Sequence, residues 1–209
     1  ALKGKSFDKT ILNASEHLFG LSYSDTLMLR NFCYRNNYLF SSMMGGSESL
    51  RDLQESRSLG ADVFEFPLVE SIFSMKKILN ALKKVFADDL SLLHNKLVFI
   101  DICTFDGLDI LENLSKLKFF EFIDESNFVF NFDRKMLVKS EKRIKKDSFE
   151  VFEYEKDIND RIFGIIKKYN GISTFNFSIS GGIRNESLLS FFEYELKPHF
   201  IKTGMFTFP

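Results

Sequence analysis

The period of the hydrophobic pattern changes repeatedly along this chain, and this switching constrains the fold more than any other feature of the sequence. Short apolar runs alternate with stretches in which apolar residues recur three and four positions apart. The first pattern is typical of buried strands and the second of amphipathic helices. We therefore expect strands and helices to alternate along the chain, as they do in an α/β fold.

Seven segments are predicted to be strands, and helical patterns fall between them. The predicted strands cover residues 18–23, 38–44, 61–68, 96–103, 127–132, 173–179 and 199–206, and the predicted helices cover residues 25–36, 47–59, 70–86, 106–117, 148–169 and 185–195. The strands are near-continuous apolar runs, as expected of parallel strands that are covered on both faces. The connections are long enough for right-handed crossovers between parallel strands.

Two short segments of similar sequence favour closure of the sheet into a barrel. The segment GGSESL begins at Gly45, and the segment GGIRNESL begins at Gly181. Quasi-equivalent βα units repeat around a TIM-type (β/α) barrel, which has eight strands. The missing strand falls before residue 1, within residues 117–125, or is absent. We predict a single TIM-type barrel domain over residues 1–209, with seven visible strands.

Composition and charge exclude several classes of protein. Hydrophobic residues make up 44% of the chain and charged residues 27%, as in soluble globular proteins. A formal net charge of -1 gives no long-range attraction for nucleic acid or anionic lipid. The most basic segment, residues 139–147, is expected to be a solvated loop.

The location of the protein is predicted from three further features. No apolar run reaches the roughly 20 residues that span a membrane, and the first residues lack the apolar core of a signal peptide. Cys33 and Cys103 stand far apart and form no CxxC motif. A reducing, cytoplasmic compartment is therefore expected.

Candidate catalytic residues follow the predicted strands, because the working residues of such barrels lie at the carboxyl ends of the strands. They are Glu70, Cys103 and Asp133. Carboxylate oxygens suit a divalent metal such as Mg²⁺, and an acidic ring of this kind also suits an oxyanionic substrate bound to the metal. Each residue also has a purely structural explanation. Glu70 lies near a helix start, where its negative charge interacts favourably with the helix macrodipole. Asp133 could be a turn or cap residue, and Cys103 could be a small hydrophobic residue of the core.

Two glycine loops provide candidate substrate-binding residues. Glycine allows positive φ and close backbone approach, free N–H groups at a helix start bind phosphate or carboxylate, and an arginine adds a bidentate contact. A tight turn explains the glycines equally well, and the glutamate of the first loop also favours the helix macrodipole. The candidates are Gly45, Gly46, Glu48, Gly181, Gly182 and Arg184.

A longer set of segments resembles the HpcH/HpaI aldolase and citrate lyase beta-subunit family, as a divergent member. These segments are GGSESLRDLQESRSLGADVFEFPLVES, FIDICTFDGLDILENLSKL and SGGIRNESLLSFF, and the resemblance covers roughly residues 18–206 in order. The resemblance implies a pyruvate kinase-like (β/α) barrel. It also implies a lyase or aldolase that acts beside the carbonyl of an oxo acid, with Mg²⁺ or Mn²⁺ as a Lewis acid on the enolate.

The resemblance weakens at the positions where the family binds its metal. The metal-binding Glu of the family's IET motif falls on Cys103, and the second ligand, an Asp, matches Asp133 without the family's glycine. A basic residue that the family carries two positions before the GG falls on Met43. Cysteine is a soft ligand, whereas Mg²⁺ prefers oxygen, so one remaining carboxylate predicts weak metal binding.

Two hypotheses therefore remain open. In the first, the protein is a lyase or aldolase for a small oxo acid, with Asp133 and Glu70 holding the metal. The glycine loop that carries Arg184 would hold a carboxylate or phosphate of the ligand. In the second, the barrel is catalytically degenerate and binds such a ligand, or a protein partner, without turnover. The sequence leaves a homo-oligomer open and predicts no nucleic-acid or membrane partner.

Overall fold

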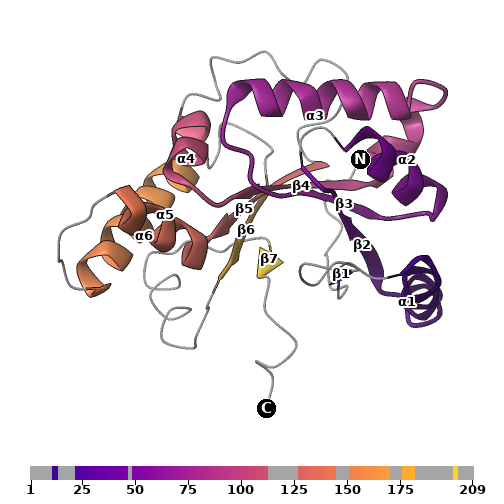
Figure 1. The fold of residues 1–209 in the computed structure, drawn as a ribbon, viewed down its shortest axis with the longest axis horizontal. Coiled ribbons are helices and arrows are strands. Elements are labelled where there is room, and N and C mark those ends of the chain that lie inside the picture. The colour runs from indigo at the N-terminus through magenta and orange to yellow at the C-terminus, as the bar shows by residue number, and fades with distance from the viewer. Residues whose placement is uncertain are drawn as a thin grey trace.

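The chain folds into a parallel sheet with helices packed along one of its faces (Figure 1). The computed structural model describes residues 11–13, 22–46, 49–112, 127–144, 151–169, 176–181 and 200–201. In this part of the chain, strands and helices alternate as the hydrophobic pattern predicts. No helix in the described ranges combines the length and the apolar character needed to cross a membrane.

The strands pair in chain order, and every pairing is parallel. They are β1 (Ile11–Asn13), β2 (Leu39–Met43), β3 (Val63–Phe66), β4 (Leu97–Ile102), β5 (Phe128–Asp133), β6 (Asn176–Ser180) and β7 (Phe200–Ile201). The body of the sheet is the five strands β2 to β6, with short β1 and β7 at its edges. The predicted α/β class with a parallel sheet is confirmed. The described pairings do not include one between β1 and β7, so closure into a barrel stays a prediction.

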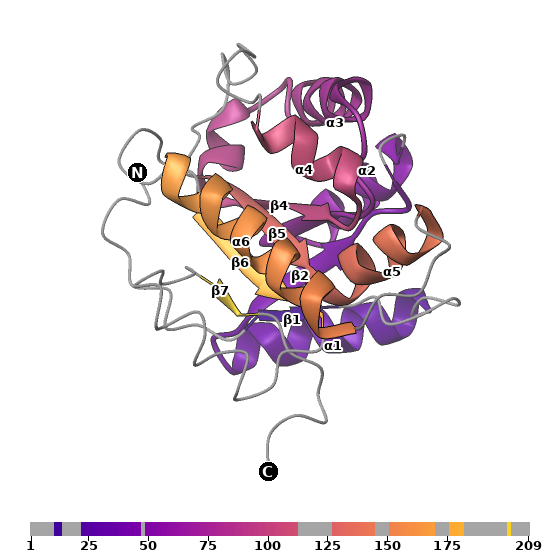
Figure 2. The ribbon, with the colours of Figure 1, turned by 90° about the vertical axis from the view of Figure 1, so that its left-hand side faces the viewer.

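The helices connect successive strands and lie around the sheet (Figure 2). They are α1 (Tyr23–Arg35), α2 (Leu50–Ser58), α3 (Ile72–Val85), the short 3₁₀ helix η1 (Leu90–Asn95), α4 (Phe105–Glu112), α5 (Arg134–Ile144) and α6 (Val151–Tyr169). The boundaries of α3 follow local chemistry. Ser71 Oγ accepts a hydrogen bond from the Ser74 N–H at 3.0 Å, and Lys83 and Lys84 lie in the last turn. These groups complement the positive and negative ends of the helix.

The first predicted strand is wrong where the structure describes it. Ser22 is the N-cap of α1, and its Oγ accepts a hydrogen bond from the Asp25 N–H at 3.2 Å. Tyr23 is already helical. A capping serine with an acid in the first turn starts a helix, and this local signal outweighs the short apolar run before it. Residues 18–21 lie outside the described residues, as do the predicted eighth-strand segment 117–125 and the predicted helix 185–195.

The predicted solvated loop at residues 139–147 is also wrong in its first part. Residues 139–144 form the end of α5. Leu137, near the middle of this helix, is fully buried in the main core. Because tertiary packing of a few apolar residues stabilises most helices in proteins, this anchor holds a helix that is otherwise rich in charge.

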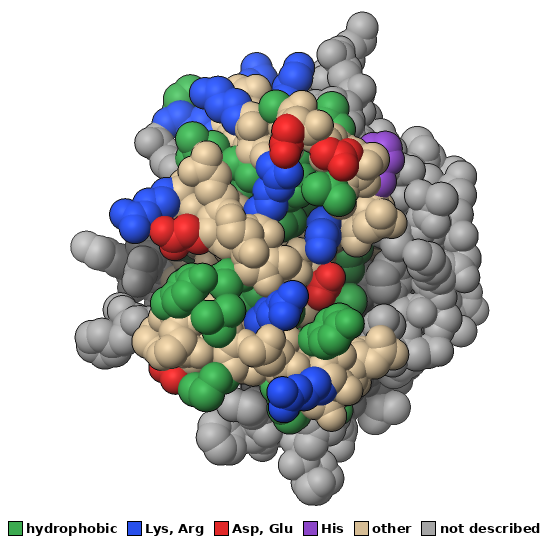
Figure 3. Space-filling model, turned by 90° about the vertical axis from the view of Figure 1, so that its right-hand side faces the viewer, with side chains coloured by type: hydrophobic (Ala, Val, Ile, Leu, Met, Phe, Trp, Pro, Cys, Tyr) green, Lys and Arg blue, Asp and Glu red, His purple; other side chains and the backbone are tan. Residues whose placement is uncertain are grey.

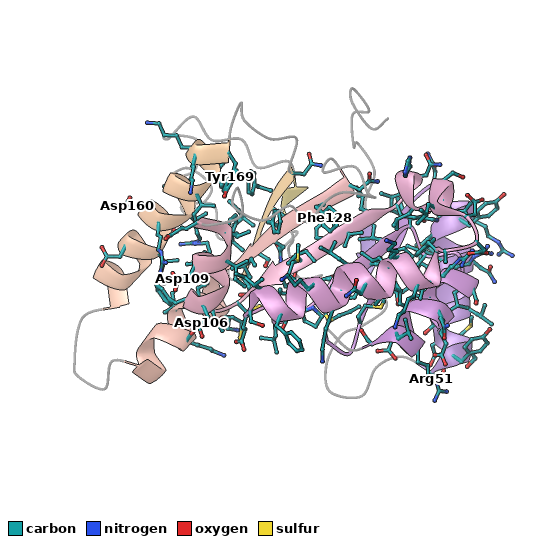
Figure 4. All side chains as sticks on the ribbon, turned by 90° about the horizontal axis from the view of Figure 1, so that it is seen from above. Arg51, Asp106, Asp109, Phe128, Asp160 and Tyr169 are labelled. Atoms are coloured by element: carbon teal, nitrogen blue, oxygen red, sulfur yellow. The ribbon has the colours of Figure 1, made fainter. Side chains whose placement is uncertain are left out.

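The main core lies between the helices and one face of the sheet, which we call the helix face. Every second side chain of a strand points to the same face. On β5 and β6 these positions carry Phe130, Phe132 and Phe177, and the rings of Phe132 and Phe177 stack with centroids 6.0 Å apart. Phe128, labelled in Figure 4, is also fully buried in this core.

The helices on this face also bond to one another. Helices α4 and α6 lie side by side at one end of the molecule (Figure 4). Tyr169 Oη donates to the Leu111 carbonyl oxygen at 2.6 Å. Arg161 forms ion pairs with Asp109 and with Glu112, the latter at 2.8 Å. These contacts hold the helix that precedes β6 to the helix that follows β4.

Exposed side chains are mixed in character on the face shown in Figure 3. Lys and Arg side chains there are scattered among acidic and apolar ones. Helix α1 contributes exposed apolar groups, with Tyr23 67% and Tyr34 79% exposed. Single exposed apolar side chains are common on protein surfaces, so we assign no function to them.

The opposite face of the sheet, which we call the inner face, has two halves. Toward the amino ends of the strands it carries a small apolar cluster of Val63, Leu97, Phe99 and Val129, with Leu39 packed against it. Toward the carboxyl ends, buried polar residues take over. The strands are buried on both faces, as predicted, and the change from apolar to polar side chains places polar chemistry at one end of the sheet.

Candidate functional site

Two rows of polar side chains cross the carboxyl-terminal half of the inner face. Asp101 of β4, Asn131 of β5 and Ser178 of β6 lie opposite one another in the strand register, and their exposed fractions are 6%, 1% and 0%. One step closer to the carboxyl ends, Asp133 lies opposite Ser180. We call these five residues the polar rows. Charged and amide groups are seldom buried without partners or a function, so the polar rows form the candidate site.

Asn131 links three neighbouring strands. Its Nδ2 donates to Asp101 Oδ1 at 2.9 Å and to Ser180 Oγ at 3.0 Å. A side-chain amide has two N–H donors and one carbonyl acceptor. Both donors are used here, so the orientation of the amide is fixed by β4 and β6. The remaining polar atom, Oδ1, has no hydrogen-bond partner in the described part of the chain.

Asp101 is a carboxyl group that changes charge near neutral pH. The pKa of Asp101 is raised to about 7, because the effect of burial, which is the largest cause, exceeds the opposing effect of the hydrogen bond from Asn131, and the negative charge of Asp133 adds to the rise. Both the protonated and the ionised forms are therefore populated near pH 7. A group of this kind is suited to donating or accepting a proton in a reaction.

Cys103 lies among the acidic groups of the site as a neutral thiol. It follows β4 directly and is 6% exposed. The pKa of the Cys103 thiol is raised to about 12, mainly by burial and in smaller part by the negative charges of Asp101, Asp133 and Glu70. The structure therefore brings the three predicted catalytic residues, Glu70, Cys103 and Asp133, to one end of the sheet. A neutral thiol is a poor nucleophile and a poor metal ligand, which favours the structural alternative for Cys103.

Asp133 acts as the cap of a helix. Its Oδ1 accepts a hydrogen bond from the Met136 N–H at 3.0 Å, in the first turn of α5. A carboxylate at this position also meets the positive end of the helix macrodipole. The cap alternative for Asp133 is thus present in the structure. This cap occupies Oδ1, one of the two carboxylate oxygens of Asp133.

Gly181 packs directly against this cap. Its φ is +81°, and a Cβ added there would lie 2.2 Å from Asp133 Oδ1 and 2.7 Å from the Lys135 backbone nitrogen. Only glycine tolerates both the backbone conformation and the close approach. Close packing therefore accounts for the first glycine of the GGIRN loop. Gly182 and Arg184 lie outside the described residues, so anion binding by this loop stays a prediction.

The first glycine loop has the same arrangement with another acid. The Gly45 N–H donates to Asp52 Oδ2 at 2.8 Å, and a Cβ at Gly45 would lie 2.9 Å from that oxygen. Asp52 is in the first turn of α2. The carboxylate that this glycine binds therefore comes from the chain itself. Gly46 has φ +131°, and a Cβ added there would meet no described atom within 4 Å, while Glu48 lies outside the described residues.

The donor groups at this end of the sheet do not suit Mg²⁺ or Mn²⁺. Asp133, the predicted ligand, already uses Oδ1 as a helix cap, and Cys103 offers a neutral sulfur where an oxygen ligand is needed. Within the described ranges, no group of three or more His, Cys, Asp or Glu side chains could hold a metal ion. Metal binding stays a prediction from the family resemblance, and the described donors do not support it.

Comparisons with solved structures test the resemblance inferred from the sequence. Citrate synthase SbnG matches with a TM-score of 0.67 at 12% identity, covering 93% of this chain and 76% of that chain. An HpcH/Hpal aldolase/citrate lyase family protein from Burkholderia cenocepacia J2315 matches with a TM-score of 0.66 at 11% identity, and the match covers 93% of this chain and 78% of that chain. An HpcH/HpaI aldolase from Desulfitobacterium hafniense DCB-2 matches with a TM-score of 0.63 at 10% identity, covering 93% and 76%.

This chain has the fold of the HpcH/HpaI aldolases. The resemblance that the sequence predicted is thereby confirmed at the level of structure. Sequence comparison alone gives no such match, since neither a family model nor a curated protein matches the chain. At 10–12% identity these likenesses show the fold alone, so residue roles must come from the chain itself.

Sequence reasoning missed Asp101, Asn131 and Ser178, which the structure places at the centre of the site. They were hidden because each is flanked by large apolar residues, as in FIDIC, VFNFD and FSIS. A signal was present in the spacing. Polar or sulfur-bearing residues recur two positions apart at the carboxyl end of each of these strands, which is the period of one face of a strand.

We predict that Gly181→Ala destabilises the fold and that Gly164→Ala does not. The first substitution forces a Cβ into the Asp133 cap at a positive φ, and we expect the free energy of unfolding to fall by about 2 kcal/mol or more. Gly164 lies in α6 with nothing within 4 Å of an added Cβ, so alanine there should stabilise by about 0.5–1 kcal/mol. Urea denaturation measures both. Equal stability of Gly181→Ala and wild type would contradict the close packing.

We predict that Asp101→Asn changes how stability depends on pH. Between the ordinary carboxyl pKa of 3.8 and the folded value of about 7, the unfolded chain loses this proton while the folded chain keeps it. The free energy of unfolding of wild type should therefore fall relative to Asp101→Asn as pH rises through this window, and the loss should be complete above pH 7.

The measurement is chemical denaturation of both proteins at about pH 4.5 and about pH 8, with an expected relative change of a few kcal/mol. Asp160→Asn is the matched control, because Asp160 is an exposed acid of α6 (Figure 4). This variant controls for the loss of one carboxyl group outside the buried site. A constant difference for Asp101→Asn would show that Asp101 is not a buried neutral acid.

Proposed function

We propose that this protein is a carbon–carbon lyase or aldolase that acts on a small oxo acid bound at the carboxyl ends of β4, β5 and β6. The observation that carries the proposal is the gathering of the polar rows, with Asp101 among them, at this end of a sheet that has the HpcH/HpaI aldolase fold. Closure of the sheet into a TIM-type barrel is part of the proposal. In such barrels the working residues lie at this end of the strands.

The chemistry needs one group that moves a proton beside the carbonyl of the oxo acid. Making or breaking the adjacent carbon–carbon bond develops negative charge on the carbonyl oxygen, and a fixed hydrogen-bond donor stabilises that charge. Asp101 serves the first need, because its ionised form accepts the proton and its protonated form returns it. Asn131 holds the Asp101 carboxyl in place through the contact at 2.9 Å.

The carboxylate of the oxo acid needs positively polarised groups, which the polar rows do not provide. Asp101 and Asp133 would repel it when they are ionised. We therefore propose that Arg184, in the loop that follows Gly181, binds the carboxylate or a phosphate of the ligand. Arginine binds such groups in bidentate fashion. No step of the proposal passes through a metal, because the described donor groups do not suit Mg²⁺.

We predict that the protein exchanges the methyl protons of pyruvate with solvent. In deuterium oxide, ionised Asp101 takes a methyl proton to give the enolate, and the carboxyl group returns a deuteron from solvent. Proton NMR should show loss of the methyl signal faster than in protein-free buffer. Asp101→Asn should slow this exchange about 10²-fold or more, and chelation with EDTA should leave the rate unchanged.

Ser42→Ala is the matched control for the exchange experiment. Ser42 lies on β2, and its Oγ bonds to Ser56 Oγ of α2 at 2.7 Å, on the helix face. This variant should exchange pyruvate at the wild-type rate. Binding of pyruvate without any exchange would refute the lyase proposal and leave a barrel that binds its ligand without turnover, which no observation on the described residues favours.

We predict that Cys103→Glu binds a divalent metal ion and that wild type does not. The substitution places a second carboxylate near the Asp133 carboxylate. Hard divalent cations bind carboxylate oxygens. Millimolar Mn²⁺ should raise the melting temperature of Cys103→Glu by a few degrees, since binding to the native state is stabilising. Wild type and Cys103→Ser should not respond. A rise in the melting temperature of wild type with Mn²⁺ would instead support the metal-dependent mechanism that the family resemblance implies.

A further inference from the structure

The outward side of helix α3 carries lysines and large apolar side chains. This helix (Ile72–Val85) lies along the top of the molecule in Figure 1 and contains no acidic residue. Its buried side chains all lie on the side that packs on the core, and the spacing of a helix places the lysines on the opposite side. The outward residues that matter here are Ile72, Phe73, Lys76, Lys77, Lys83 and Lys84. We call them the α3 face.

The electrostatics of the helix itself explain only part of this positive charge. Lys83 and Lys84 lie in the last turn, where cations interact favourably with the helix macrodipole. Lys76 and Lys77 lie far from that turn, so the macrodipole does not account for them. Lys76 and Lys84 form no ion pair with any residue in the described ranges.

Two acidic side chains near α3 are already paired with arginines. Helix α2 packs beside α3, and its Glu55 pairs with Arg51 at 2.9 Å. Asp88, which follows α3, pairs with Arg57 at 2.7 Å. These two acids are therefore neutralised by other groups. The charge of the α3 face is left to attract an anion from outside the molecule.

The amino-terminal end of the α3 face is apolar and exposed. Phe73 is 66% exposed and Ile72 is 38% exposed. Lys77 Nζ lies 4.6 Å from the centroid of the Phe73 ring, and this cation–π contact helps to hold the ring at the surface. Exposed apolar groups that are bordered by polar residues mark sites of contact with other molecules.

Leu68 is an independent sign of such a contact at the same end of the helix. It lies three residues before Ser71, the N-cap of α3. Its φ is +56°, which bulky residues seldom adopt, and its side chain is 53% exposed. The next residue, Val69, is buried, and its N–H donates to the Asp101 carbonyl oxygen at 3.3 Å, so the loop is held in this conformation. Glycine would fit this backbone without strain. A strained and exposed leucine therefore indicates a role outside the fold.

We propose that the α3 face and Leu68 form a docking surface for an acidic segment of a partner protein. Carboxylates of the segment pair with the lysines, and a large apolar side chain at one end of the segment packs against Phe73 and Leu68. The surface from Ile72 to Lys84 is about 18 Å long, which about twelve helical residues span. This surface lies on the side of α3 away from the sheet, so the assignment does not rest on the proposed function.

The distribution of apolar groups favours a protein over a membrane or a nucleic acid. A helix that lies in a membrane surface buries an apolar face along its length, whereas the apolar groups of the α3 face occupy only its first turn. Single-stranded nucleic acid needs a series of aromatic side chains for stacking, and the α3 face has one ring.

The test measures binding of labelled peptides to the full chain by fluorescence anisotropy. The acidic peptide has about twelve residues, mostly glutamate, with leucines at one end, and the second peptide has glutamine in place of each glutamate. Wild type should bind the acidic peptide about tenfold or more tightly. Its affinity should fall as sodium chloride is raised from about 0.05 M to about 0.5 M, because salt screens exposed charges.

The combined variant Lys76→Glu, Lys84→Glu should weaken binding of the acidic peptide about tenfold or more, since it reverses two charges of the surface. The matched control is Lys139→Glu, Lys167→Glu, which makes the same change in charge at exposed positions of α5 and α6. The control should keep the wild-type affinity within about twofold. Both variants should keep the wild-type melting temperature, because all four side chains are exposed.

Leu68→Gly should change stability and binding in opposite directions. Its melting temperature should rise because the strain at a positive φ is removed, while the dissociation constant of the acidic peptide should increase about threefold or more. Leu92→Ala is the control, because Leu92 is a 44% exposed leucine of η1, and it should keep the wild-type affinity. A lower melting temperature with unchanged binding in Leu68→Gly would show that Leu68 serves the fold alone, which refutes the apolar end of the surface.

The remaining outcomes overturn the proposal. They include equal affinity of wild type for the two peptides, and undiminished binding by the Lys76→Glu, Lys84→Glu variant. Tighter binding to phosphatidylserine vesicles or to labelled single-stranded DNA would identify a lipid or a nucleic acid as the occupant. Self-association of wild type in analytical ultracentrifugation that the same variant abolishes would identify a second copy of this chain instead.

Discussion

The rest of the structure depends on the packing of phenylalanine rings against the helix face of the sheet. Phe128, Phe130 and Phe132 occupy alternate positions of β5 and are all buried. Burial of one such ring contributes about 1.5–3 kcal/mol. Because a shift of one residue would move all three rings to the other face, this layer fixes the register. The register in turn aligns Asp101, Asn131 and Ser178 on the inner face.

The sequence was sufficient for most of the fold because the hydrophobic period changes where the chain changes structure. Strands β2 to β6 lie within or close to predicted segments. The errors came from local chemistry: Ser22 caps a helix where an apolar run suggested a strand, and α5 depends on a buried Leu137 within a charged segment. Neither signal is visible in the period alone.

The candidate site could be predicted only where its residues follow the strands. Cys103 and Asp133 stand at strand ends, so position alone identified them, whereas Asp101 and Asn131 lie inside runs that look wholly apolar. The glycine loops show a second limit. No local pattern could reveal that Asp52 bonds to Gly45, because helix packing onto the sheet, which is a tertiary property, brings the two residues together.

The division of the sheet into a helix face and an inner face has a consequence for evolution. The aromatic layer lies within the main core on the helix face, and it does not involve the side chains that alternate with it. Exchange of a reactive group on the inner face therefore leaves this layer in place. The family resemblance predicts that Cys103, in place of a glutamate, is one such exchange. A lineage with this architecture can lose one chemistry and acquire another by a few substitutions, without losing the fold in between.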